Sequence, residues 1–228
     1  LLVEDNELNR EVAAEIIGMT GAEIEVSNDP YFRTSELLCC LTDTPRTNLN
    51  YYYPKISRPY RYVRFTPPPP AYPTADCRAE VAELAFFDSV DSEEHLPSKA
   101  IYGGGPVDEN PAHDIDKACD DDWLTFYYSS GPQDSIVFDL KRARAIKKIL
   151  FVPRNDDNFI TPGNVYELFY QSGVKGWISL GVQTATTNEL TYRNIPEGAL
   201  LWLRNLTRGK EEQVFYIENG KQRFVGYE

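Results

Sequence analysis

The fold is decided by the stretch Ser135-Ile-Val-Phe-Asp-Leu140, which is followed closely by Ala145-Ile-Lys-Lys-Ile-Leu-Phe-Val152. Both segments are short and rich in β-branched and aromatic residues, as is typical of neighbouring antiparallel strands. Similar segments follow at short intervals, namely Val165–Tyr170, Gly176–Leu180, Leu200–Arg204 and Glu212–Tyr216. No segment among them has the length of a covering α-helix, so residues 100–228 are predicted to form an antiparallel β-sandwich, most economically a jelly roll.

A fainter set of strand patterns lies upstream. Glu23–Val26, Arg61–Phe65 and Glu80–Phe87 have the composition of strands. The pattern of Arg61–Phe65 followed by Ala82–Phe87 parallels that of Leu201–Asn205 followed by Glu211–Tyr216, with Glu83 falling opposite Glu212. Likewise, Ala22–Asn28 parallels Asn164–Tyr170. This internal repeat predicts two tandem units of one fold. The first, residues 22–89, would be incomplete, and the polar residues 90–99 would link it to the second.

The first 21 residues have a different pattern. Leu8, Val12 and Ile16 repeat at helical spacing, and Gly18 or Gly21 can end the helix. Residues 1–21 are therefore predicted to form a short N-terminal helical segment. Because the chain begins at Leu1, we expect a mature chain or an excised fragment, so a missing signal peptide says little about compartment.

Composition limits the classes of function. The 228 residues include 23 Lys and Arg against 35 Asp and Glu, a net charge of −12 that disfavours binding to nucleic acid. The longest apolar runs are far too short to cross a bilayer, so no transmembrane segment is predicted. The four cysteines have no zinc-site spacing, and free thiols are favoured over a disulfide framework; they are Cys39, Cys40, Cys77 and Cys119.

Several ordered motifs resemble one family. They are Lys117-Ala-Cys-Asp-Asp-Asp-Trp-Leu-Thr-Phe126, Ile136–Leu140, Ile149–Arg154, Tyr166–Tyr170 and Trp177–Leu180. Together they are similar to the discoidin family, also called the coagulation factor V/VIII type C or galactose-binding-like domain. The ending Thr207–Gln222 resembles the form found in secreted and surface proteins of gut Bacteroidetes. The resemblance implies a jelly roll without catalysis, a structural Ca²⁺ and ligand recognition by loops at one end. It also implies a secreted, periplasmic or cell-surface protein.

The resemblance places the calcium ion in the loop Asp120–Thr125. Hard oxygen ligands suit a hard cation, and the family pattern carries over to Asp120, Asp122 and Thr125, with Glu212 arriving from the last strands. The family usually has Gly where Asp121 stands, so this loop departs from the pattern. An acidic, solvated turn without metal is the alternative.

The polar loop after residue 153 is the expected ligand site. Arg154, Asp156 and Asp157 offer donors and acceptors to sugar hydroxyls, and Tyr127, Tyr128 or Trp177 could stack on the apolar face of a sugar. Two alternatives remain open: Arg154 could anchor the loop internally, and Trp177 could belong to the core.

The expected function is a noncatalytic module that binds carbohydrate or another cell-surface ligand. Asp156 and Asp157 are chain neighbours, which rarely flank one site at the separation that glycosidase chemistry needs. His95 and His113 suggest no nucleophile–base pair. The alternatives are a structural spacer beside a catalytic domain and, with less support, a double jelly-roll amidase that releases glycans.

Overall fold

The chain forms two compact units, divided between Asp157 and Asn158. The computed structural model describes residues 19–43, 45, 49–69, 78–104, 106, 110–155, 157, 159–187, 189–211, 214–219 and 221–225. We call the described residues up to 157 the N-terminal unit and those from 159 the C-terminal unit. Most of the predicted helix over 1–21 lies outside the described residues, so that helix stays a prediction.

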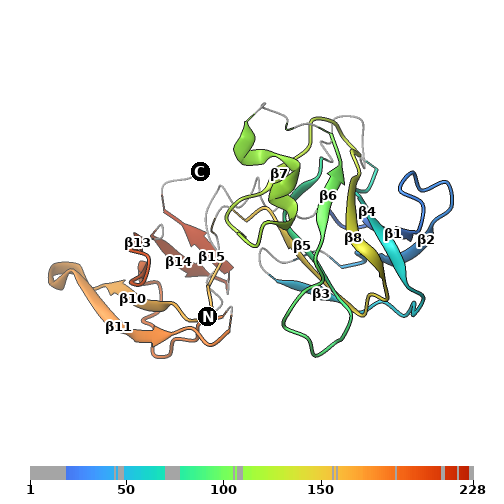
Figure 1. The fold of residues 1–228 in the computed structure, drawn as a ribbon. Coiled ribbons are helices and arrows are strands. Elements are labelled where there is room, and N and C mark those ends of the chain that lie inside the picture. The colour runs from blue at the N-terminus through green and yellow to red at the C-terminus, as the bar shows by residue number, and fades with distance from the viewer. Residues whose placement is uncertain are drawn as a thin grey trace. The chain divides into compact units, whose positions relative to one another are not determined.

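Antiparallel strands make up both units, which confirms the all-β prediction (Figure 1). In the described residues the helices are short 3-10 turns, and none is long and apolar enough to cross a membrane. The strands of the N-terminal unit are β1 (Glu23–Ser27), β2 (Glu36–Cys40), β3 (Asn50–Tyr52), β4 (Tyr60–Thr66), β5 (Glu80–Phe87), β6 (Lys99–Tyr102), β7 (Tyr127–Tyr128), β8 (Ile136–Arg144) and β9 (Lys148–Pro153).

The N-terminal unit is a sandwich of two sheets. One has the strand order β2-β1-β4-β8-β6 and the other β3-β9-β5-β7. Rings from the two sheets meet in the core: Phe65 of β4 stacks on Phe151 of β9 with centroids 5.6 Å apart, and Phe86 of β5 meets Phe138 of β8 edge-on, also at 5.6 Å. Burial of such apolar surface is the main force that holds the sheets together.

Strand β5 is buried along its whole length, in agreement with its apolar sequence. A bulge between Val81 and Glu83 shifts its register against β9. Leu84 and Phe86 face the core between the sheets, while Ala85 and Phe87 pack into a second cluster that includes Trp123 and Phe126. The bulge therefore leaves Glu83 on the same face as Ala85 and Phe87, the face that packs against Trp123 and Phe126.

The unit boundary differs from the predicted one. Strand β4 pairs with β8 and β5 pairs with β9, so strands on both sides of residues 90–99 belong to the same two sheets. The expected linker itself packs on the unit, because Leu96 is buried and its N–H donates to the Phe86 carbonyl at 2.6 Å.

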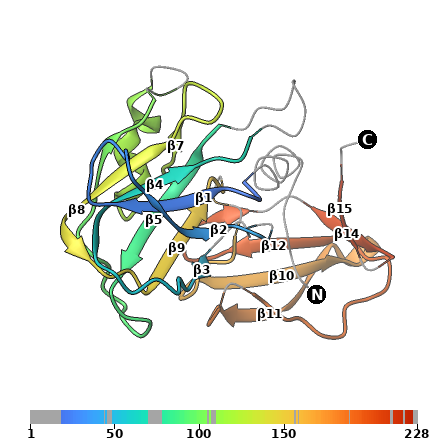
Figure 2. The ribbon, with the colours of Figure 1, turned by 90° about the vertical axis from the view of Figure 1, so that its right-hand side faces the viewer.

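The C-terminal unit is one antiparallel sheet with the order β11-β10-β12-β14-β15 and a small β13 beside β12. Strands β10, β11 and β12 lie side by side (Figure 2). Tyr166, Leu168, Leu201 and Leu203 form its core with Phe215 and with residues of the 185–195 connection. The strands are β10 (Val165–Gln171), β11 (Trp177–Thr184), β12 (Leu201–Asn205), β13 (Lys210–Glu211), β14 (Phe215–Glu218) and β15 (Lys221–Phe224).

Candidate functional site

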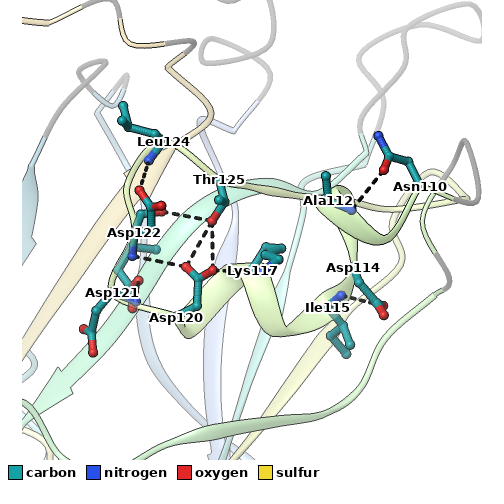
Figure 3. A network of polar contacts seen from close by, with 11 residues as sticks. Asn110, Ala112, Asp114, Ile115, Lys117, Asp120, Asp121, Asp122, Leu124 and Thr125 are labelled. Carbon is teal, nitrogen blue, oxygen red and sulfur yellow. Dashed lines mark hydrogen bonds and ion pairs between the residues drawn. The ribbon is translucent and has the colours of Figure 1, made fainter. Parts of the chain in front are cut away.

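Two short 3-10 helices lead into the acidic loop of the N-terminal unit. They are η1 (Pro111–His113) and η2 (Ile115–Cys119). Asn110 caps the first by accepting from the Ala112 N–H at 3.0 Å, and Asp114 caps the second by accepting from the Ile115 N–H at 2.8 Å. Such caps satisfy backbone donors that have no partner within the turn. They fix where the loop begins (Figure 3).

Three residues expected to bind calcium come together in this loop. The Thr125 hydroxyl lies 3.0 Å from both carboxylate oxygens of Asp120 and 3.0 Å from the Asp122 carbonyl oxygen. Asp120 also accepts from the Asp122 N–H at 3.1 Å, and the Lys117 ammonium lies 3.2 Å from its other oxygen (Figure 3). The loop is thus closed around the Asp120 carboxylate.

Asp121 has the left-handed backbone conformation, with φ of 63°. Glycine adopts this region at little cost, whereas other L-residues are strained there. The loop therefore has at Asp121 the conformation that a glycine favours. The loop thus keeps the turn even though Asp121 stands where the resembled family usually has Gly.

A carboxylate that the sequence did not assign to the site lies directly beneath the loop. Glu83 of β5 is only 2% exposed, and its Oε2 accepts from the Asp121 N–H at 3.0 Å. Burial raises the pKa of Glu83 to about 8, the Asp121 N–H opposes that rise, and the charges of Asp121 and Asp120 add to it. Glu212, the predicted ligand from the last strands, lies outside the described residues.

The donor set of this loop suits a hard cation, since carboxylate, hydroxyl and carbonyl oxygens are what Ca²⁺ prefers. A buried carboxylate with a raised pKa close to two further acidic residues is also the environment that a cation would relieve. Within the part of the chain that the structure describes, no three His, Cys, Asp or Glu side chains are grouped as metal ligands. Asp120 instead interacts with Thr125 and Lys117.

A cluster of arginine and aromatic side chains follows the same loop. The Phe126 ring stacks on His113 with centroids 4.5 Å apart, and the Arg154 guanidinium lies 4.7 Å from the Phe126 centroid. Tyr128 lies at the edge of the His113 ring, 6.4 Å between centroids, and the Arg78 guanidinium lies 5.8 Å from the Tyr128 centroid. We call these five residues the arginine–aromatic cluster.

Arg154 has a fixed position in this cluster. Its Nη1 lies 3.1 Å from Oε2 of Glu80, a side chain that is 7% exposed, while the Arg154 side chain is 21% exposed. A charge-assisted bond to a buried carboxylate and contact with a ring restrict the guanidinium to few orientations. Arg154 is therefore anchored while part of its side chain stays exposed.

The other predicted ligand residues are dispersed. Tyr127 is fully buried, its hydroxyl donates to the Gly104 carbonyl at 2.9 Å, and burial raises its pKa, so it is a core residue. Asp157 is half-buried and its N–H donates to Asn155 at 2.9 Å, while Asp156 lies outside the described residues. Trp177 is 37% exposed on β11 of the C-terminal unit.

The sequence reasoning missed four members of this region. His113, Phe126 and Arg78 belong to the cluster, and Glu83 lies under the acidic loop. A signal for Phe126 exists, because residues two apart on a strand share a face and Phe126 precedes Tyr128 by two. The signal for Glu83 is the internal repeat, which places it opposite Glu212.

Comparison of the chain with protein-family models, with curated proteins and with solved structures gave no match.

Proposed function

We propose that this chain is a noncatalytic carbohydrate-binding module of a secreted or cell-surface protein, with its ligand at the arginine–aromatic cluster. We propose with it that the sandwich has the jelly-roll topology of the discoidin resemblance. The observation that carries the proposal is Arg154, which is held on Phe126 and by Glu80 while part of it stays exposed. Arg154 and Tyr128 were both expected to contact sugar, and both lie in this cluster.

The chemistry of the cluster suits a sugar. A guanidinium presents several N–H donors in one plane, which can bond to neighbouring hydroxyls. Aromatic rings offer flat apolar surface for the C–H face of a pyranose, and a tyrosine adds a polar tip. Because Arg154 is already positioned, little side-chain entropy is lost when a ligand binds.

Calcium is proposed as a structural ion of the neighbouring loop. Asp120, Asp122 and Thr125 would supply oxygens, and Glu83 would supply the strand carboxylate that the resemblance assigned to Glu212. The ion would neutralise the acidic residues and make the Asp120–Thr125 loop more rigid. This loop directly precedes Phe126 of the arginine–aromatic cluster. What supports this ion site is geometry: the Thr125 hydroxyl contacts the Asp120 carboxylate and the Asp122 carbonyl oxygen, and buried Glu83 accepts from the Asp121 N–H beside them.

Binding can be tested on a glycan array and by affinity electrophoresis with the whole chain. Arg154→Lys keeps the positive charge beside Glu80 but loses the planar fork, so retention should weaken at least about tenfold, or ~1.4 kcal/mol in binding free energy. Tyr128→Ala should weaken it in the same direction. Arg33→Ala is the matched control, because its side chain is 75% exposed and lies in the β1–β2 connection.

A spacer that only holds another domain in place would bind no glycan, so a blank array with a folded chain would reject the proposal. Release of sugar or ammonia from glycopeptides would reject the noncatalytic reading. If the parent chain and Arg154→Lys were retained equally, the ligand site would not be at this cluster.

A further inference from the structure

The sheet of the C-terminal unit has an aromatic face opposite its core. Tyr166 and Leu168 point into the core, so Phe169 and Gln171 of β10 lie on the other face, because side chains alternate along a strand. The register places Trp202 of β12 directly opposite Phe169, and Trp177 of β11 opposite Gln171. All four side chains therefore share one face of the sheet.

The three rings touch one another. The Trp202 ring centroid lies 5.5 Å from that of Phe169 and 5.5 Å from that of Trp177. The two indoles come from β11 and β12, which flank β10, so they meet across the middle strand. We call Phe169, Trp177 and Trp202 the aromatic face. Trp177 is 37% exposed.

Polar groups border the aromatic face. The Arg204 guanidinium lies 5.2 Å from the Trp202 centroid, and its Nη2 lies 3.4 Å from Glu211. Arg204 Nε and Gln171 Oε1 are buried and have no hydrogen-bond partner among the described residues. A buried donor or acceptor without a partner is costly, so both side chains would gain by turning toward a polar ligand group.

The corresponding face of the N-terminal unit has the same strand register but other residues. Its register pairs Glu25 with Arg64 as the C-terminal register pairs Glu167 with Arg204. Two residues further along, Ser27 pairs with Tyr62 in the N-terminal unit, and Phe169 pairs with Trp202 at the equivalent position of the C-terminal unit. Both sheets also have the same local order, β2-β1-β4 in one and β11-β10-β12 in the other. The aligned segments 22–28 with 61–65 and 164–170 with 201–205 thus share one strand register, whereas 82–87 and 211–216 do not: β5 pairs with β9 in the second sheet, and β14 pairs with β12.

The two units differ in what packs on this face of the sheet. In the N-terminal unit Tyr62 is 8% exposed because it packs with Phe32 and Val137. Phe32 comes from the β1–β2 connection, residues 28–35, and the Arg64 guanidinium lies 4.5 Å from its ring. The β10–β11 connection, residues 172–176, is shorter and includes the fully exposed Val174. The corresponding rings of the C-terminal unit contact one another instead.

We propose that the aromatic face, with Gln171 and Arg204, is a second glycan-binding site. A pyranose stacks its C–H face on the exposed Trp177 indole, which the Trp202 ring supports at an interplanar angle of 52°, and its hydroxyls bond to the Arg204 guanidinium, whose side chain is 38% exposed, and to the Gln171 amide once that side chain turns outward. A glycan fits better than a protein partner. The face consists of three rings, of which Trp177 is 37% exposed and the other two are half-buried, so it presents far less than the ~800 Å² that each partner buries in a stable protein interface.

This inference goes beyond the proposed function, because it rests on different residues in the other unit. A site that uses the arginine–aromatic cluster and a site on the aromatic face can each bind without the other. Two weak sites on one chain strengthen attachment to a polymer through effective concentration.

The test uses the whole chain with Trp123→Phe as background. The chain has three tryptophans, so this background leaves only Trp177 and Trp202 to fluoresce. The probes are soluble hydroxyethylcellulose, galactomannan, xylan and mucin O-glycans, first by affinity electrophoresis and then by fluorescence titration. At least one probe should retard the chain and change its emission to a saturating level.

Trp177→Ala and Trp202→Ala should each weaken that binding at least tenfold, and Trp202→Tyr should restore most of it because a ring is retained. Val174→Ala, in the connection between β10 and β11, is the exposed control. Trp177→Ala keeps the test decisive if Trp202→Ala lowers the melting temperature, since Trp177 is the more exposed ring.

Arg154→Lys separates the two proposals. Binding that survives Arg154→Lys but not Trp177→Ala assigns the ligand to the aromatic face alone. No retardation by any probe overturns the inference, as does retardation that both tryptophan variants leave unchanged. Saturable binding of another protein that is lost in Trp177→Ala, with no glycan binding, would also overturn it.

Discussion

Glu83 and Asp121 are joined by a hydrogen bond of 3.0 Å that runs from the backbone N–H of Asp121 to a carboxylate 2% exposed beneath it. The bond connects β5 to a loop 38 positions later in the chain. It joins the two features on which the acidic loop depends, a buried acid and a left-handed turn.

Stability in the presence of chelator should fall as pH rises from about 5 to 8. The pKa of Glu83 is about 8 in the folded chain and about 4.5 unfolded, so in this window the folded state holds a proton that the unfolded state has released. Folding is then favoured at the acidic end, and the difference is on the order of a few kcal/mol. Glu83→Gln, which cannot ionise, should show a flatter dependence in melts across this range. A slope equal to that of the parent chain would contradict the assignment.

Calcium should raise the melting temperature. An ion that binds only the native state adds stability by mass action, ~2.7 kcal/mol at a concentration one hundred times its Kd. Excess chelator should remove this gain, and Asp122→Ala should abolish the sensitivity. Asp29→Ala, on the β1–β2 connection, is a control that should respond to calcium like the parent chain. Superimposed melting curves with calcium and with chelator would reject the ion.

Asp121→Gly should be more stable than Asp121→Ala by about 1 kcal/mol, because only glycine adopts φ of 63° without steric cost. Both variants lose the contact of 3.0 Å between Asp121 and His95, in which the Asp121 side chain is 69% exposed. The comparison therefore isolates the backbone. Denaturant unfolding of the two variants measures it, and equal midpoints with equal slopes would show that the loop relaxes in Asp121→Ala.

The thiols of Cys39 and Cys119 should react slowly in the native chain. Burial raises the pKa of Cys39 to about 12, with a further rise from Cys40, and burial raises that of Cys119 to about 11. The thiolate is the reactive form, so alkylation at pH 8 should be much slower than in urea. Mass spectrometry of iodoacetamide-treated samples follows each site. Rapid native labelling of Cys39 would show that β2 opens readily.

Local patterns predicted most strands, but not which strands pair. Glu80–Phe87 was predicted as a strand with the same bounds that β5 has, because a run of apolar residues marks a strand buried on both faces. Pairing depends on tertiary packing. Arg61–Phe65 and Leu201–Asn205 have similar patterns, so nothing in either segment shows which of them lies beside β8. In the structure that neighbour is β4.

In the candidate site, too, the sequence predicts local groupings of residues but not those that depend on strand pairing. Asp120, Asp122 and Thr125 are close in sequence, so their convergence follows from one loop and could be foreseen. Glu83 and Arg78 reach the region through sheet pairing and could not be placed without it. Tyr127 was misassigned as a surface ring because a two-residue strand, β7, does not show which face is buried.

The pairing of β3 with β9 has a consequence for synthesis. Asn50 donates through its side chain to the Phe151 carbonyl at 3.2 Å, across 101 positions of the chain. A nascent chain ending before residue 136 has β4 without its neighbour β8, and β5 stays without β9 until residue 153 has been added. Sheets made of such distant pairs fold slowly, since loop closure precedes any gain from contact. The apolar strands that are synthesised first therefore have unpaired edges until the later strands emerge from the ribosome. During that interval the chain is most prone to self-association.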